Sequence, residues 1–346
     1  MILMLICSKC GRKFEEKFIL RCTCGGTLLV KRKYDSFAPR KFLDIRRYID
    51  YLPVDEKFLP SLTPGITPIS KISDEVYLKL DYLQPTGSFK DRGTYVTVAK
   101  IKEEGIDEVV IDSSGNAGLS LATYGMAEGI KVHVFLSYNA KPEKIARLNS
   151  VNARLHFVEG DRMRVHEEAV KFSERTGIPY ASHWLNPYFL EGTKTIAFEI
   201  YEQIGIPRYI FVPVGSGTAF LGIWKGFKEL LEMGEINKMP SLVAVQAEGY
   251  ESLCKRSKSV NKLADGIAIP NPPRIEEMKV ALRETSGFCI SVGEEETLAG
   301  YHWLRRNGFF IEETSATALA GYWKAREKGL VKGSSLLLLT GSAKSF

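Results

Sequence analysis

Long hydrophobic runs are missing from this sequence of 346 residues. Residues 1–7 are apolar, but the stretch is too short for a membrane-spanning helix, and no basic region precedes it as in a signal peptide. No later apolar run approaches the length that a membrane span needs. We therefore expect a cytoplasmic protein that has no membrane partner.

A concentration of charge of one sign is also missing. The 47 lysines and arginines and the 41 aspartates and glutamates give a formal net charge of +6, and the basic residues are scattered along the chain. Because no basic stripe is present, we do not expect nucleic acid as a partner. Internal repeats and low-complexity segments are absent too. The apolar share of 45% and the charged share of 25% are those of an ordinary globular chain, whose length predicts two or three domains.

Cysteine is scarce, yet four of the six cysteines lie within the first 24 residues. They form the two motifs Cys7-x-x-Cys10 and Cys22-x-Cys24, each followed by glycine. Two such turns brought together supply the four sulfur ligands of a tetrahedral, structural zinc site, and buried or disulfide-bonded cysteines are the alternative. In a cytoplasmic protein we expect cysteines to be reduced, so the isolated Cys254 and Cys289 are interpreted as packing residues.

From residue 76 onward, short apolar runs alternate with amphipathic segments, whereas residues 31–74 contain proline and glycine punctuation and are expected to be extended. The pattern predicts buried strands at 76–80, 109–111, 131–136, 154–158, 209–214, 242–245 and 336–339. Helical periodicity is found from Asp91 onward and at 119–128, 166–176, 190–204, 219–232, 298–307 and 316–328. This alternation predicts an α/β fold, with parallel sheets covered by helices on both faces.

Residues 85–94 read Pro-Thr-Gly-Ser-Phe-Lys-Asp-Arg-Gly-Thr and join a predicted strand to a predicted helix. Lys90 lies at the joint, and Gly87 and Gly93 allow the backbone to approach a ligand closely. Lysine is a nucleophile only when its amine is neutral, which a desolvated pocket favours. An ordinary strand-to-helix turn with an exposed lysine would explain a lone Gly-Ser-x-Lys, but ten residues carry more information.

These ten residues resemble the motif of the cofactor-binding lysine in fold-type II pyridoxal-phosphate (PLP) enzymes, in the form found in threonine synthases. The resemblance implies a fold like that of tryptophan synthase β, with two parallel-sheet lobes and a small amino-terminal zinc ribbon like those of some archaeal and bacterial threonine synthases. We expect the ribbon at 1–33, the large PLP-binding lobe at 34–91 with 177–346, and the smaller lobe at 92–176. By the same resemblance, Lys90 binds the cofactor and acts as general acid and base, and Ser88 contacts the substrate.

Two further loops extend the resemblance, although each alone would pass for a plain turn between strand and helix. Residues 113–118, Ser-Ser-Gly-Asn-Ala-Gly, are similar to the Ser-x-Gly-Asn loop of the family. This similarity implies that Asn116 bonds the cofactor's ring hydroxyl. Contacts to the substrate carboxylate are implied for Ser113, Ser114 and Ala117, although the family usually has threonine where Ala117 stands.

Residues 215–218 follow a predicted strand and begin a helix, where backbone N–H groups and the helix dipole form an anion site for the cofactor phosphate. This expected phosphate loop consists of Gly215, Ser216, Gly217 and Thr218.

The last predicted strand ends at Thr340, in a Leu-Thr-Gly sequence like that at the end of the family's chains. The resemblance implies that the Thr340 hydroxyl meets the pyridine nitrogen of the cofactor, while capping of its own loop is the alternative. Glu248 is expected near the cofactor ring, and Thr314 and Ser315 are interpreted as a helix cap.

Phe189 departs from the family pattern, which has arginine at this position to bind the phosphate of O-phosphohomoserine. Phenylalanine cannot bond a phosphate, so another cation or donor must replace the guanidinium. The residues considered for that role are Lys144, Arg162, Arg164, His183 and Lys194.

The resemblance therefore predicts a PLP-dependent lyase that converts O-phosphohomoserine and water to threonine and phosphate, with structural zinc and an amino-acid phosphate ester as small-molecule partner. Phe189 favours the alternatives of β-replacement on O-phosphoserine (cysteine or cysteate synthesis) and of a serine/threonine ammonia-lyase. A zinc-ribbon binding protein without catalysis is a third reading, against which Lys90 and Asn116 argue. A homodimer is expected by analogy alone.

Overall fold

The computed structural model describes residues 4–343 and divides into two compact units. Unit 1 contains the chain up to Arg32, Arg40–Pro64 and Lys90–Gly192, and unit 2 contains Lys33–Pro39, Gly65–Phe89 and the chain from Thr193. Unit 1 therefore contains the expected smaller lobe, residues 92–176, together with the expected ribbon. It also contains residues 40–64 and 177–192, which were expected in the large lobe.

The amino-terminal part of unit 1 is a small antiparallel sheet of β1 (Met4–Cys7), β2 (Lys13–Phe14) and β3 (Leu28–Lys31), in the order β2-β1-β3. Two short 3-10 helices follow, η1 (Ile45–Tyr51) and η2 (Glu56–Phe58). The prediction of extended chain over 31–74 is wrong at these helices. The side chains of Asp44 and Asp55 each accept a hydrogen bond from the backbone N–H two residues later, so both helices are capped at their first turn.

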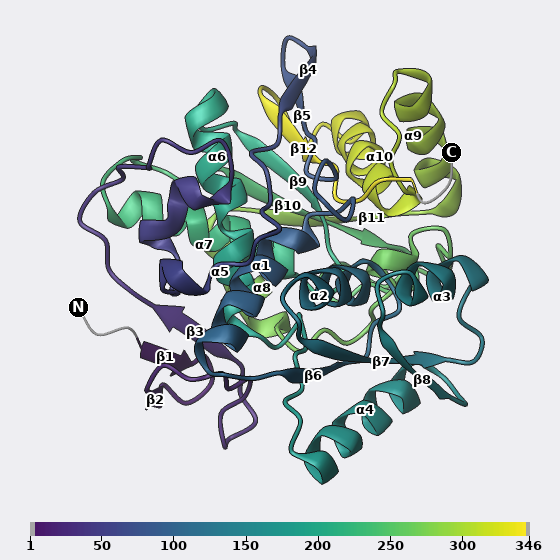
Figure 1. The fold of residues 1–346 in the computed structure, drawn as a ribbon. Coiled ribbons are helices and arrows are strands. Elements are labelled where there is room, and N and C mark those ends of the chain that lie inside the picture. The colour runs from purple at the N-terminus through teal and green to yellow at the C-terminus, as the bar shows by residue number, and fades with distance from the viewer. Residues whose placement is uncertain (1–3, 344–346) are drawn as a thin grey trace. The chain divides into compact units, whose positions relative to one another are not determined.

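The remainder of unit 1 is a three-stranded parallel sheet with helices on both faces (Figure 1). Its strands, in spatial order, are β6 (Glu108–Ile111), β7 (Lys131–Ser137) and β8 (Arg154–Val158). The helices of this region are α1 (Lys90–Glu103), α2 (Asn116–Ala127), α3 (Pro142–Asn149), α4 (Arg162–Thr176) and α5 (Pro187–Thr193). Alternate strand residues face opposite ways. Val109 and Val132 share a core with α1, α2 and the ribbon, whereas Val110 and Phe135 pack against α4.

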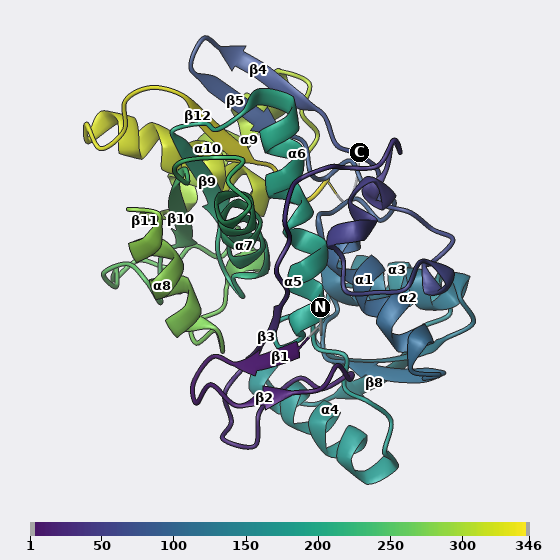
Figure 2. The ribbon, with the colours of Figure 1, turned by 90° about the vertical axis from the view of Figure 1, so that its left-hand side faces the viewer.

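Unit 2 is built on a six-stranded sheet in the order β11-β10-β9-β12-β5-β4, parallel except for the edge strand β4. The strands are β4 (Ile69–Ser73), β5 (Val76–Lys79), β9 (Tyr209–Pro213), β10 (Ser241–Ala247), β11 (Phe288–Val292) and β12 (Ser335–Leu338). The helices are α6 (Thr195–Ile204), α7 (Thr218–Glu232), η3 (Asp265–Ile267), α8 (Ile275–Glu284), α9 (Glu294–Arg306) and α10 (Glu313–Glu327). Helices α10 and α7 lie on opposite sides of β9 and β10 (Figure 2).

Buried β-branched and leucine runs made the central strands predictable, and all seven predicted strands are present. The predicted helix at 190–204 is instead two helices, α5 and α6, interrupted at Lys194. Residues 191–195 read Glu-Gly-Thr-Lys-Thr, so the break lies where the apolar periodicity is interrupted.

Cys254 and Cys289 are joined by a disulfide, so their interpretation as isolated, reduced packing residues is wrong. Cys289 lies in β11, and Cys254 lies in the loop after the neighbouring strand β10. Thirty-five residues separate the two cysteines, and only the pairing of the two strands brings them together.

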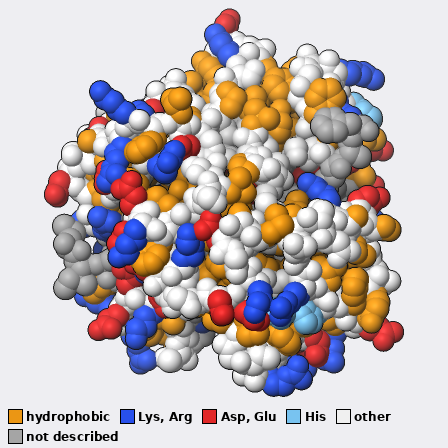
Figure 3. Space-filling model, in the orientation of Figure 1, with side chains coloured by type: hydrophobic (Ala, Val, Ile, Leu, Met, Phe, Trp, Pro, Cys, Tyr) orange, Lys and Arg blue, Asp and Glu red, His pale blue; other side chains and the backbone are white. Residues whose placement is uncertain are grey.

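Within residues 4–343, no helix combines the length and the apolar character that crossing a membrane requires. On the face drawn in Figure 3, lysines and arginines are interspersed with aspartates and glutamates, as the scattered charges of the sequence predict.

Candidate functional site

The motif that precedes Lys90 is attached to the end of the central strand β12. The backbone N–H of Phe89 donates to the carbonyl of Thr340 (3.0 Å), and the N–H of Ser342 donates to the carbonyl of Gly87 (2.8 Å). Gly87 has φ = +80°, and a methyl carbon added there would lie 2.3 Å from the Ser342 hydroxyl oxygen. Glycine is therefore required both for the turn and for the close approach of the two segments.

Ser88 pairs through its backbone with Gly341, and its side chain is fully buried. Within residues 4–343, its hydroxyl has no hydrogen-bond partner. An unsatisfied buried hydroxyl costs free energy, and its presence beside a candidate site indicates a group that completes it.

The backbone at Thr340 is held by Ser315, a residue interpreted from the sequence as part of a helix cap. The Ser315 hydroxyl accepts hydrogen bonds from the N–H groups of Thr340 (3.0 Å) and Gly341 (2.8 Å). Ser315 and Thr314 lie inside the first turn of α10, whose N-cap residue is Glu312, so the interpretation of the pair as a helix cap is wrong. Ser315 instead fixes the backbone after β12, and its distance from Thr340 in the sequence concealed this role.

The expected phosphate loop leads from β9 into α7. Because β9 and β12 are neighbouring parallel strands, this loop and Thr340 lie at the same edge of the unit 2 sheet. Gly217 precedes α7 with φ = +83°, and a methyl carbon on Gly215 would lie 2.7 Å from the backbone of η3. The hydroxyls of Ser216 and Thr218 are buried and 3.5 Å apart. The loop combines backbone and hydroxyl donors at a helix N-terminus, a suitable arrangement for an anion.

In unit 1, Lys90 and Asn116 are the first residues of α1 and α2. The starts of these two helices are joined because the Ser120 hydroxyl donates to the Asp91 carboxylate (2.6 Å). The structure therefore brings the lysine and the asparagine to the same end of a helix pair, as the motif resemblance implies for a shared ligand.

The loop between β6 and α2 is compact. Ser113 and Ser114 are half-buried and Ala117 is buried, and a methyl carbon on Gly118 would lie 1.7 Å from the Ser113 carbonyl oxygen. Glycine is needed at this point because the backbone of the loop folds directly against the helix that it precedes.

Phe189 lies in the apolar interior of unit 1, close to the start of α1. Its side chain is 2% exposed, and its ring contacts Gly93, where a methyl carbon would lie 2.4 Å from a ring atom. His183 meets the Phe189 ring edge-on, with 5.9 Å between centroids. Burial, and then the positive charge of Lys90, lower the pKa of His183 to about 3, so the imidazole is neutral at physiological pH.

Three of the cations considered as substitutes for the arginine have carboxylate partners. Lys194 is fully buried and pairs with Glu229 (2.8 Å), and the exposed Arg164 pairs with Glu168 (3.0 Å). Arg162 pairs with Asp112 (3.0 Å), the residue that follows β6.

Each unit, taken by itself, carries donors of the kind that PLP needs. In unit 2, the loop from Gly215 to Thr218 suits a phosphate and Thr340 offers a hydroxyl, and in unit 1, Lys90 offers an amine and Asn116 an amide. The buried, unsatisfied hydroxyl of Ser88 agrees with a ligand that completes its hydrogen bonding. Glu248 lies at the end of β10 and has Lys324 at 3.6 Å.

The four amino-terminal cysteines form one cluster, as their spacing predicts. Their sulfur atoms all lie within 4.8 Å of one another, with separations of 3.5–3.6 Å for Cys7–Cys24, Cys10–Cys22 and Cys10–Cys24. Zinc–sulfur bonds of about 2.3 Å in a tetrahedron place sulfurs about 3.8 Å apart, so the cluster fits zinc. Burial would raise the pKa of the Cys7 thiol, but hydrogen bonds from the N–H groups of Cys10 and Lys9 outweigh it and lower that pKa.

Comparison with known proteins agrees with this geometry. Residues 61–341 match the family described as "Pyridoxal-phosphate dependent enzyme". The chain is 33% identical to the threonine synthase of Methanocaldococcus jannaschii and 32% identical to that of Methanosarcina acetivorans. Each alignment covers 94% of this chain and 88% of the relative.

Solved structures show the same fold at lower sequence identity. The processed form of threonine deaminase isoform 2 from Solanum lycopersicum superimposes with a TM-score of 0.73 at 20% identity, covering 90% of each chain. The serine racemase of maize gives a TM-score of 0.68 at 19% identity, over 80% of this chain and 88% of the other. At these identities the similarity concerns the fold, the two-lobed α/β architecture expected from the sequence.

Proposed function

This chain belongs to the family of pyridoxal-phosphate-dependent enzymes, and we propose that it is a threonine synthase-like lyase that converts O-phosphohomoserine and water to threonine and phosphate. The observation that carries the proposal is the motif at Lys90 and its attachment to the strand end at Thr340. The alignments with threonine synthases over most of the chain support the same substrate.

PLP, when bound, supplies an electron sink that makes protons on the substrate's α and β carbons removable. The reaction removes protons from the α and β carbons and breaks the bond between the γ carbon and the phosphate oxygen. Protons are then added at the γ and α carbons, and the hydroxyl of water is added at the β carbon. We assign proton transfer at these carbons to the Lys90 amine Nζ. Ser88, Ser113, Ser114 and the backbone N–H of Ala117 are proposed to hold the substrate carboxylate.

For the cofactor itself, we propose that the loop from Gly215 to Thr218 holds the phosphate through backbone N–H groups and hydroxyls. Asn116 and Thr340 are assigned to the ring hydroxyl and the ring nitrogen. Ser315 positions Thr340 through its two hydrogen bonds to the backbone.

The test is product analysis with purified enzyme and PLP. O-Phosphohomoserine should release inorganic phosphate and threonine in equal amounts. If this substrate yields neither product while O-phosphoserine, serine or threonine is consumed, the threonine synthase assignment is wrong.

Phe189 favours a second candidate, a serine/threonine ammonia-lyase or an enzyme of β-replacement on O-phosphoserine. Its buried ring cannot bond a phosphate, the His183 imidazole beside it is neutral, and Arg164 and Arg162 already have carboxylate partners, so none of these residues offers an unpaired cation in place of the arginine. A 2-oxo acid formed from serine or threonine would establish the ammonia-lyase. Phosphate released from O-phosphoserine together with a substituted amino acid would establish β-replacement.

We also propose that the four-cysteine cluster holds structural zinc. Four sulfur ligands leave no open coordination position, so the ion would stabilise the ribbon without taking part in the reaction. The cytoplasmic location and the homodimer are further proposals, and light scattering of the purified protein tests the second.

A further inference from the structure

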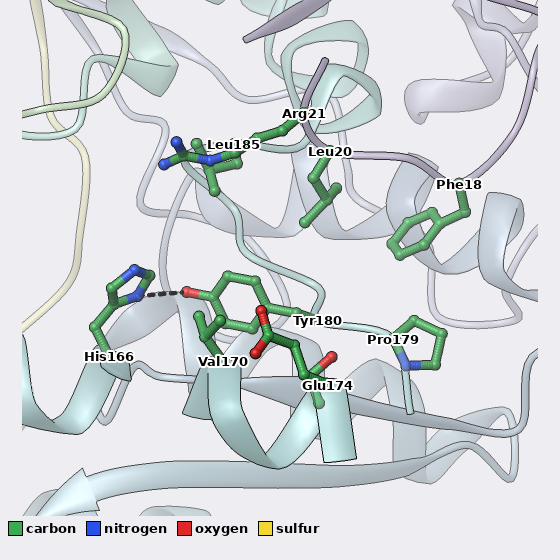
Figure 4. A pocket seen from close by; sticks show the side chains of 10 residues that line it. Phe18, Leu20, Arg21, His166, Val170, Glu174, Pro179, Tyr180 and Leu185 are labelled. Carbon is green, nitrogen blue, oxygen red and sulfur yellow. Dashed lines mark hydrogen bonds between the residues drawn. The ribbon is translucent and has the colours of Figure 1, made fainter. Parts of the chain in front are cut away.

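Unit 1 contains a cavity of about 500 Å³ away from Lys90, with walls from two different parts of the chain. Figure 4 shows one wall formed by the ribbon segment with Phe18, Leu20 and Arg21, and the facing wall formed by α4 and Tyr180. This volume lies within the range of small-molecule sites in proteins.

Two exposed side chains of opposite charge belong to these walls. Arg21 comes from the ribbon side and Glu174 from α4 (Figure 4). Over residues 4–343, neither side chain forms an ion pair or a hydrogen bond, although other charged residues of α4, such as Arg164 and Glu168, do. The cavity therefore offers one guanidinium and one carboxylate whose charges are not neutralised within the described chain.

The rest of the lining is mostly apolar. Leu185 is buried, and Phe18, Leu20 and Val170 are partly buried. A ligand that complements both the two charged side chains and the apolar lining needs an anionic group, a cationic group and an aliphatic body. An α-amino acid with an aliphatic side chain has all three, its carboxylate suiting Arg21 and its ammonium suiting Glu174.

The cavity is also linked to the loop that carries Asn116. Two residues of its wall, Tyr180 and His166, bond the Asp112 carboxylate, at 2.7 Å from the Tyr180 hydroxyl and 3.0 Å from His166 Nδ1. Asp112 is buried and directly precedes Ser113, the first residue of that loop. A ligand that contacts this wall differently in two arrangements of the loop would shift the equilibrium between them.

We propose that this cavity is an effector site for an aliphatic α-amino acid, and that its occupancy acts on the Ser113–Asn116 loop through Tyr180, His166 and Asp112. The site is distinct from the one that holds Lys90, so its test does not depend on which reaction the enzyme catalyses.

Calorimetric titration of the PLP-loaded enzyme with L-leucine tests binding. We expect saturable binding of one molecule per cavity. Binding of 4-methylpentanoate, which lacks the ammonium, and of isoamylamine, which lacks the carboxylate, should each be at least tenfold weaker. Absence of L-leucine binding, or equal binding of all three compounds, would overturn the proposal.

Variants distinguish this cavity from the catalytic site. Arg21→Gln and Glu174→Gln should each weaken L-leucine binding at least tenfold, whereas Lys13→Gln in the ribbon and Glu167→Gln on α4 should leave it unchanged. All four positions are exposed, so the fold should persist, which circular dichroism checks. L-Leucine binding that survives both cavity variants would have to occur elsewhere, and the proposal would fail.

Tyr180→Phe tests the link to the loop, because it removes the hydroxyl that bonds Asp112 and keeps the ring. L-Leucine should change KM or kcat of the parent enzyme with whichever substrate it turns over. In Tyr180→Phe the same ligand should still bind while its effect on the kinetics falls by half or more. Saturating binding without any kinetic effect in the parent would overturn the effector role.

Discussion

At the scale of single residues, Gly93 shows how the site depends on a contact between two helices of unit 1. The ring of Phe189 occupies the space where a side chain at Gly93 would lie, one turn beyond Lys90. A residue that departs from the expected family pattern and a glycine within the lysine motif are therefore packed against each other. A substitution at either position is therefore expected to change the side-chain packing at the other.

Gly93→Ala should destabilise the protein by about 1–3 kcal/mol, because the added methyl overlaps the Phe189 ring and packed interiors resist such insertions. Phe189→Leu in the same chain should restore part of the loss. Urea unfolding measures both. Gly65→Ala is the matched control, since a methyl there meets open space. Equal stability of Gly93→Ala and the parent would contradict the packing described here.

Lys90→Ala should abolish the covalent attachment of PLP and lower turnover by about 10²–10⁴-fold or more, since both the attachment and the proton transfers are assigned to this amine. Borohydride reduction followed by mass spectrometry of the peptide that contains residue 90 measures the attachment. Ser88→Ala should retain the attachment and serves as the control. Retained turnover in Lys90→Ala would refute the assignment.

His183 predicts a pH dependence of stability. Burial and the Lys90 charge lower its pKa from about 6.5 in the unfolded chain to about 3 in the folded protein. Above pH 6.5, the imidazole is neutral in both states and the full stability is present. As the pH falls below 6.5 toward 3, the unfolded chain takes up a proton that the folded protein does not, so the free energy of unfolding falls by up to about 1.4 kcal/mol per pH unit.

Urea unfolding of the parent and of His183→Gln at pH 7, 6 and 5 measures this contribution. The variant should show a smaller loss of stability between pH 6.5 and 5 than the parent, with both proteins in the same cofactor state. If the stability of the parent and of His183→Gln falls equally with pH, His183 takes up its proton at a similar pH in the folded and the unfolded protein, which contradicts the prediction.

At the scale of elements, the parts of the fold with strong local patterns were predictable and those that depend on distant partners were not. The central strands are buried runs such as Tyr209–Pro213, and the cysteine spacing alone indicated the cluster. Helix α3 escaped prediction because its eight residues make little more than two turns, too short for a helical period to stand out. Helix α8 escaped prediction because its buried apolar residues, Met278 and Ala281, lie among charged residues.

In the candidate site too, residues in local motifs were predictable from the sequence, whereas contacts between distant residues were not. Lys90 and Asn116 stand in recognisable motifs, and their positions at helix starts follow from the strand-to-helix pattern. Ser315 was misinterpreted, and the disulfide of Cys254 was missed, because each partner lies 25 residues or more away in the sequence. Sequence spacing shows local chemistry, whereas contacts across a sheet require the strand order.

The ribbon permits a test at this scale. Cys7→Ser combined with Cys10→Ser should remove zinc and lower the unfolding temperature, because two of four ligands are lost. Turnover at low temperature should change much less than stability. Cys254→Ser with Cys289→Ser should keep its zinc and is the control. Equal zinc content in the ribbon variant and the parent would exclude the four-sulfur site.

At the scale of the whole molecule, the disulfide predicts the state of the cysteines after unfolding. Thiol titration in denaturant with a chelator and without reductant should detect four of the six cysteines, and reduction should reveal the other two. Six reactive thiols before reduction would mean that Cys254 and Cys289 are not bonded in the protein as isolated.

The strand order of unit 2 has a consequence for how the chain is made. Strand β12, formed by Ser335–Leu338, lies between β9 and β5, which belong to much earlier parts of the sequence. On the ribosome, the nascent chain must therefore wait for residues 335–338 before the two halves of the sheet can join. Until then, β5 and β9 each present an open edge, the kind of surface that misassembles. Since the segment before Lys90 is held by the backbone at Thr340 and Ser342, that segment and the sheet are completed in one late step of synthesis.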